Sequence, residues 1–103
     1  MPKMTCDGWW EQEGYGRQPM TDLVIEFTDG RLLGQGDDIV GPFVLKGQLD
    51  DDCLYLRKQY IGQHAIDYHG SSMGEGNYAG QWSVNGYVGG EWSIRFLALS
   101  EAT

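Results

Sequence analysis

Residues 77–99, with the sequence NYAGQWSVNGYVGGEWSIRFLAL, hold the clearest structural signal in the chain. Asn85-Gly86 separates two runs rich in aromatic and β-branched side chains, and an Asn-Gly pair in that setting favours a two-residue type I′ hairpin turn. The stretch therefore predicts two antiparallel strands, at 77–84 and 87–99. The second strand is long enough to bend, and Gly89-Gly90 marks the expected bend or bulge.

The same stretch contains a short repeat. Gly80-Gln81-Trp82 and Gly90-Glu91-Trp92 share a Gly-x-Trp pattern on the two sides of the predicted turn, and Gly8-Trp9-Trp10 is a third copy near the N-terminus. Solenoid proteins repeat whole structural units at a fixed period along the chain. We therefore interpret these three short copies as repeated hairpin chemistry instead.

Short strands are predicted along the rest of the chain as well. No glycine-free window of about 11 residues has the apolar spacing of an amphipathic helix. Alternating or apolar runs recur instead, between turn signals such as Asp29-Gly30 and Asp50-Asp51-Asp52. The further strands are expected at 8–13, 20–28, 31–36, 42–49, 53–60 and 64–70, with a flexible loop at 71–76.

Eight strands in 103 residues leave about 13 residues for each strand and its turn, which is typical of an all-β meander. An open sheet of that size would expose two long edges, and closure into a barrel removes them. The 16 glycines, about twice the average share, would relieve crowding inside a small barrel. The predicted fold is all-β, a single small antiparallel up-and-down barrel spanning 1–103, with flexible tails at 1–7 and 100–103.

The composition excludes several classes of partner. Lysine and arginine number 7 against 15 aspartates and glutamates, which gives a net charge of −8, so phosphate backbones and anionic membranes would be repelled. The N-terminus lacks the apolar segment of a secretory signal, and no window approaches the apolar length of a membrane span. We expect a cytoplasmic protein in which Cys6 and Cys53 stay reduced, although their number also allows one disulfide.

An opening Gly8-x-Trp10 followed by a meander of short strands resembles the calycin group, which includes the lipocalins, the fatty-acid-binding proteins and the avidins. Residues 91–96 are similar to the closing strand of such a barrel. The resemblance implies the barrel architecture and places Trp10 at the closed end. It implies no ligand, because the polar set that avidins use to hold biotin has no residue-by-residue match here.

The predicted strand at 53–60 is the most informative for function. If Leu54 and Leu56 point inward, the two-residue period of a strand also turns Lys58 and Tyr60 inward. By the same alternation Tyr68 points inward from the next strand. An aromatic-lined pocket with one ammonium group is typical of a small-molecule site, and the ammonium would hold a carboxylate or a phosphate. The expected ligand-binding residues are Lys58, Tyr60, Tyr68, Trp82 and Trp92, with Trp82 as a wall.

Two alternatives to this pocket remain open. Lys58 can extend out of the barrel or pair with Glu26 or another inward carboxylate while the tyrosines simply pack. In the opposite register Tyr55, Arg57 and Gln59 would face inward. The leucine face is favoured inside because two of its adjacent positions are apolar.

Other chemical groups carry weaker signals. His64 and His69 are expected on the surface, and the acidic runs at 37–38 and 50–52 are expected to be solvated turns, because neither has calcium-loop spacing. Glu11 and Glu13 share one face, as exposed glutamates usually do. The sequence shows no catalytic triad and no phosphate-binding loop. We therefore expect no catalytic residues, no metal and no cofactor.

The aromatic content suggests an interaction surface. Trp9 and Trp10 point to opposite faces of their strand, so one of them is expected outside. Further apolar residues are expected to face outward, and a cluster of them would favour a partner or a homo-oligomer: Val24, Leu33, Val44, Leu97 and Leu99. The predicted function is a non-catalytic barrel that binds a small, anionic organic ligand. The alternative is a protein-interaction or homo-oligomerisation module without such a ligand.

Overall fold

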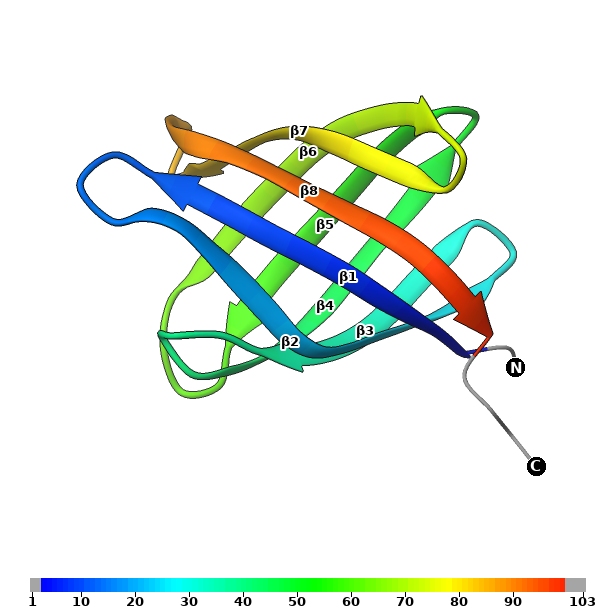
Figure 1. The fold of residues 1–103 in the computed structure, drawn as a ribbon, viewed down its shortest axis with the longest axis horizontal. Helices are drawn as coiled ribbons and strands as arrows, with labels where there is room; N and C mark the ends of the chain where they lie inside the picture. Colours follow the sequence, from blue (N-terminus) through cyan, green and yellow to red (C-terminus); the bar gives the residue numbers. More distant parts are fainter. Residues whose placement is uncertain (1–2, 100–103) are drawn as a thin grey trace.

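The computed structural model describes residues 3–99 and shows a closed antiparallel barrel. The strands are β1 (Lys3–Gln12), β2 (Gly16–Thr28), β3 (Arg31–Asp37), β4 (Pro42–Asp50), β5 (Cys53–Tyr60), β6 (Ala65–Gly74), β7 (Asn77–Val84) and β8 (Tyr87–Leu99). Each strand pairs with the next in sequence, and β8 closes the barrel on β1 (Figure 1). The predicted all-β, up-and-down barrel is confirmed.

Three strand boundaries differ from the prediction by four or more residues, and one of them is the start of β2, which lies at Gly16 instead of residue 20. β1 begins at Lys3, so residues 3–7, expected as part of a tail, lie in the sheet. β6 continues through Gly74, where a flexible loop was expected. In the β1 and β6 segments the local sequence is polar, but neighbouring strands on the two sides supply partners for the backbone, and pairing outweighs the weak local propensity. Residues 100–103, the other expected tail, lie outside the described residues.

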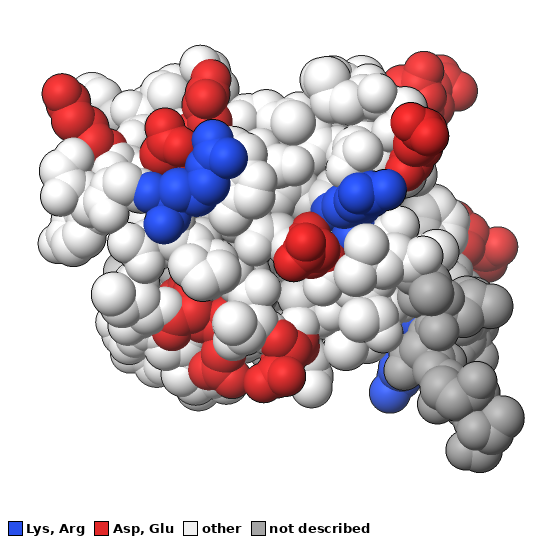
Figure 2. All heavy atoms as spheres, viewed as in Figure 1, with Lys and Arg blue, Asp and Glu red and all other residues white. Residues whose placement is uncertain are grey.

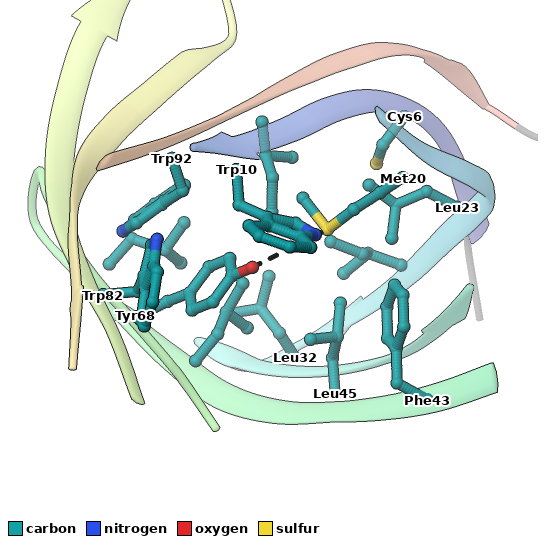
Figure 3. Packing of buried hydrophobic residues seen from close by; sticks show 14 of the residues in the cluster. Cys6, Trp10, Met20, Leu23, Leu32, Phe43, Leu45, Tyr68, Trp82 and Trp92 are labelled. Carbon is teal, nitrogen blue, oxygen red and sulfur yellow. Dashed lines mark hydrogen bonds between the residues drawn. The ribbon is translucent and has the colours of Figure 1, made fainter. Parts of the chain in front are cut away.

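The inward register of β5 is the one that the leucines predict. Leu54, Leu56, Lys58 and Tyr60 are all buried. The alternative register, with Arg57 inside, is wrong, because the Arg57 side chain is 57% exposed. The chain therefore brings a lysine into the barrel core. Figure 3 shows buried aromatic and aliphatic side chains of that core.

The Gly-x-Trp repeat has a direct packing explanation. Gly80 of β7 lies opposite Trp92 of β8, and Trp82 lies opposite Gly90. The Trp82 indole packs against Gly89 and Gly90 of β8, and the Trp92 indole reaches Gly70 of β6. The register shifts between Trp82 and Ser83, where β8 carries Gly89 as the extra residue of the expected bulge. A side chain at any of these glycines would occupy the space of an indole or of the backbone.

The two ends of the barrel differ. We call the end that holds the connections after β1, β3, β5 and β7 the mouth end, and the opposite end, with the three other connections, the far end (Figure 1, mouth end at left). Trp10, expected at the closed end, lies close to the last residue of β1 and therefore at the mouth end. The expectation rested on the resemblance alone, whereas the bounds of β1 place Trp10 two residues before the strand ends at Gln12.

Replacing Gly80 with alanine should lower the free energy of unfolding by about 3 kcal/mol or more, because the new Cβ would collide with the carbonyl oxygen of His69. Gly62→Asn is the matched control, since Gly62 has open space around it and a φ of +75° that asparagine tolerates. Urea denaturation of both variants measures the difference. Equal stability of the two would show that the glycine contact does not constrain the barrel.

Candidate functional site

A buried ion pair lies at the centre of the site. The Nζ of Lys58 donates to Oδ2 of Asp38 at 2.5 Å, and neither side chain is exposed to solvent. Lys58 also donates to the hydroxyl of Tyr68 at 3.1 Å and lies 3.6 Å from the sulfur of Met20. Its ammonium group is 4.3 Å from the centroid of the Phe43 ring, a distance suited to a cation–π contact.

Asp38 collects donors from several elements. Its Oδ2 also accepts hydrogen bonds from Nε1 of Trp10 at 3.0 Å and from the hydroxyl of Tyr60 at 2.7 Å. Its Oδ1 accepts the backbone N–H of Val40 at 2.9 Å. The carboxylate therefore joins β1, β5 and the connection between β3 and β4 in one network.

The expectation of a solvated turn at 37–38 is wrong for Asp38. Reciprocal backbone hydrogen bonds between Asp38 and Gly41 close a tight loop, which turns the Asp38 carboxylate into the barrel while Asp37 stays exposed. Alternation along β3 was the signal available in the sequence, because Leu32 and Gly36 point inward and Asp38 shares their face. The partner of Lys58 is thus Asp38 and not Glu26.

The network shifts the ionisation of its members. Burial lowers the pKa of Lys58 to about 8, even though Asp38 acts in the opposite direction. For Asp38, burial alone would raise the pKa, but the hydrogen bonds from Lys58 and Tyr60, together with the charge of Lys58, outweigh it and leave the pKa below its usual value. Burial raises the pKa of Tyr60 and Tyr68, and the Asp38 carboxylate adds to that effect. At neutral pH the network is an ion pair with two neutral phenols.

A pocket of about 330 Å³ opens at the mouth end, next to this network. Its walls are aromatic and aliphatic with two polar groups, and its lining residues are Trp10, Gln12, Val40, Tyr60, His64, Ile66, Tyr68, Trp82 and Val84. Trp10 and Trp82 meet edge to face, with ring centroids 6.2 Å apart. Figure 3 shows Trp10, Trp82 and Tyr68 gathered on one side of the barrel interior.

The five predicted site residues lie close together, but only three of them line the pocket. Tyr60, Tyr68 and Trp82 line the pocket, whereas Lys58 and Trp92 are fully buried in the packed interior beside it. Trp92 stacks on Tyr68, with centroids 5.2 Å apart, and its Nε1 donates to two backbone carbonyls. The lining residues that the prediction missed include Trp10, Gln12 and His64, whose joint position depends on barrel closure.

The remaining candidate groups lie outside the buried hydrogen-bond network, and of these His64 lines the pocket. His64 and His69 are exposed, as predicted, and their rings contact those of Tyr60 and Tyr55 in tilted arrangements, with centroids 5.2 Å and 4.9 Å apart. Both cysteines are free, with Cys53 exposed and Cys6 buried, and burial raises the pKa of the Cys6 thiol to about 12. Among residues 3–99 no three histidine, cysteine or carboxylate side chains gather as a set that could hold a metal ion.

Comparison with protein-family models, with curated proteins and with solved structures finds no match to this chain. The closed eight-stranded barrel agrees with the architecture that the resemblance implied, while membership of the calycin group stays a prediction. Residues 3–99 contain no helix of the length and hydrophobicity needed to span a bilayer.

Asp38→Asn should lower the free energy of unfolding by about 3–5 kcal/mol, because it leaves the Lys58 ammonium buried without a counter-charge. Adding Lys58→Met should recover at least about 1 kcal/mol, because the double variant buries no charge at this place. Urea denaturation of the wild type, the two single variants and the double variant gives the coupling energy. Additive losses would contradict a coupled pair.

The ion pair should also make stability depend on pH. The pKa of Asp38 is lower in the folded state, so its contribution is complete above its unfolded pKa of 3.8 and is lost as the pH falls through the folded value. The stability difference between wild type and the Asp38→Asn, Lys58→Met double variant should therefore be constant from about pH 5 to 7 and change below about pH 4. Urea denaturation across this range measures it, and the other carboxyl groups, common to both proteins, cancel. A difference that does not vary with pH would contradict the assignment.

Proposed function

We propose that this domain is a non-catalytic binding module whose mouth pocket takes a small, uncharged and largely apolar organic ligand. The observation that carries the proposal is the pocket of about 330 Å³ with aromatic walls, beside a lysine whose charge is already neutralised by Asp38. Ligand sites of about 300–1,000 Å³ with apolar walls and a few polar groups are the general pattern, and this pocket lies at the small end.

The charge of the site favours a neutral ligand over an anion. The sequence suggested that Lys58 would hold an anionic group, but its Nζ hydrogens are directed to Asp38 and Tyr68. A net charge of −8 adds general repulsion of anions. Drawing Lys58 toward a ligand would break a buried ion pair and leave Asp38 without its counter-charge.

The polar groups of the pocket divide into two sets. The Trp10 and Tyr60 donors bond to Asp38, and the Nε1 of Trp82 bonds to the carbonyl of Glu11. These bonds hold the aromatic walls in place before any ligand enters, which reduces the entropy lost on binding. The side chains of Gln12 and His64 at the edge are then the groups that would orient a ligand.

A matched series of indole probes tests the charge preference. Indole-3-acetamide should bind at least about tenfold more tightly than indole-3-acetate, because the acetate would place a charge beside apolar walls with no free counter-charge. NMR titration of the ¹⁵N-labelled protein measures both dissociation constants and locates the site through the indole N–H signals of Trp10 and Trp82. Tighter binding of the acetate would overturn the neutral-ligand proposal.

Val84→Trp should abolish binding of the acetamide, because the larger side chain fills the pocket from the end of β7. Leu33→Ser is the matched control, since Leu33 is exposed on the outside of β3 and does not line this pocket. Unchanged binding by Val84→Trp would show that the probe lies elsewhere, and so would a loss with Leu33→Ser.

A further inference from the structure

We infer that the rim of the mouth end docks a partner protein, through a segment that carries bulky apolar side chains next to lysine or arginine. The inference goes beyond the small-molecule pocket, because it concerns side chains that surround the opening. Different variants test the rim and the pocket, so each can fail without the other.

Exposed apolar side chains gather at the mouth end. Six of the ten exposed large hydrophobic residues among the described positions lie on its four connections or directly beside them, with 39–81% of each residue accessible to solvent. We call these six the rim patch: Tyr15, Ile39, Val40, Ile61, Tyr87 and Val88. Three of the four mouth connections contain at least one of them, and Tyr87 and Val88 directly follow the fourth at the start of β8, so the patch surrounds the opening.

The barrel itself does not require this patch. None of the six belongs to the hydrophobic core or packs against it. The three turns of the far end, which join strands of the same barrel, consist of Asp29-Gly30, Asp51-Asp52 and Glu75-Gly76, and Met73 is the one exposed large hydrophobic residue within two positions of these turns. Because polar turns serve equally well at one end, the apolar side chains at the other end point to a surface that is covered in use.

Acidic side chains border the rim patch, and they favour a partner segment that carries positive charge. Glu13, Asp37 and Glu91 are exposed at the mouth end, and none has an ion-pair partner among residues 3–99. Glu13 and Glu91 also line a shallow hollow of about 390 Å³ beside the rim, which has room for a basic side chain. Acidic side chains also outnumber basic ones over the face drawn in Figure 2.

The cations near the mouth do not offset this charge. Arg17 pairs with Glu11 at 3.1 Å and stacks over the Trp9 ring, and Lys58 is buried with Asp38. A second copy of the chain would bring the same carboxylates face to face, and an anionic membrane would be repelled. An apolar segment with neighbouring basic residues complements both the rim patch and its border.

Selection from a displayed library of random peptides tests the inference without a known partner. Peptides that bind the wild type are kept, and peptides that also bind an Ile39→Ser, Ile61→Ser variant are removed. This variant lacks two rim side chains that do not line the pocket. Enriched peptides should carry a bulky apolar residue beside lysine or arginine. No enrichment, or enrichment of peptides without basic residues, would overturn the inference.

The enriched peptides are then titrated against matched variants. The Ile39→Ser, Ile61→Ser variant should weaken binding at least about tenfold, and Glu13→Gln, Asp37→Asn should weaken it and reduce its salt dependence. Leu33→Ser, Met73→Ser removes two exposed apolar residues away from the mouth and should leave binding unchanged. Equal effects of the rim and control variants would contradict a specific rim surface.

Three further measurements distinguish a docked protein segment from a small ligand, a second copy of the chain and a membrane. Val84→Trp, which fills the pocket, should still bind the peptides. Peptide docking can therefore be tested even if the small-ligand proposal fails. Sedimentation of wild type and the Ile39→Ser, Ile61→Ser variant tests a second copy as the occupant. Flotation with phosphatidylcholine vesicles tests a neutral membrane. Rim-dependent dimers or rim-dependent vesicle binding would overturn the inference.

Discussion

The interaction on which the interior depends is the ion pair between Lys58 and Asp38. A lysine ammonium in a barrel core is costly unless a counter-charge and hydrogen-bond acceptors meet it there. The structure meets that demand by turning the loop after β3 inward, so that one carboxylate accepts from Lys58, Tyr60 and Trp10. Three elements that are distant in sequence are thereby held in one arrangement beside the pocket.

Glycines set the second constraint. A small closed barrel has little interior space, and three large indoles occupy part of it together with Tyr68. Trp82 fits because Gly90 and the bulged Gly89 of β8 leave room for its ring, and Trp92 fits because its ring lies against Gly70 of β6. The same contacts fix Trp82 as a wall of the pocket, so packing and binding geometry share one cause.

The mouth end combines features that the far end lacks. Its pocket has aromatic walls already fixed by hydrogen bonds, its lysine charge is neutralised within the core, and its rim carries exposed apolar side chains bordered by carboxylates. The turns of the far end are acidic and glycine-rich, of the kind that keeps β proteins soluble. This asymmetry is why both proposals, the small ligand and the partner segment, concern one end of the barrel.

Local sequence pattern was enough to predict the eight strands and the inward register. The Asn85-Gly86 turn, the two-residue alternation of 53–60 and the Gly-x-Trp repeat led to the correct strands and placed Lys58 and Tyr68 inside, because turn chemistry and side-chain alternation are encoded by near neighbours. The counter-ion of Lys58, the pocket lining and the open end depend on residues that meet only when β8 closes on β1. Strand pairing also drew residues 3–7 and 71–74 into the sheet. Those features are long-range, so they were decided by closure of the barrel, which no local run of residues specifies.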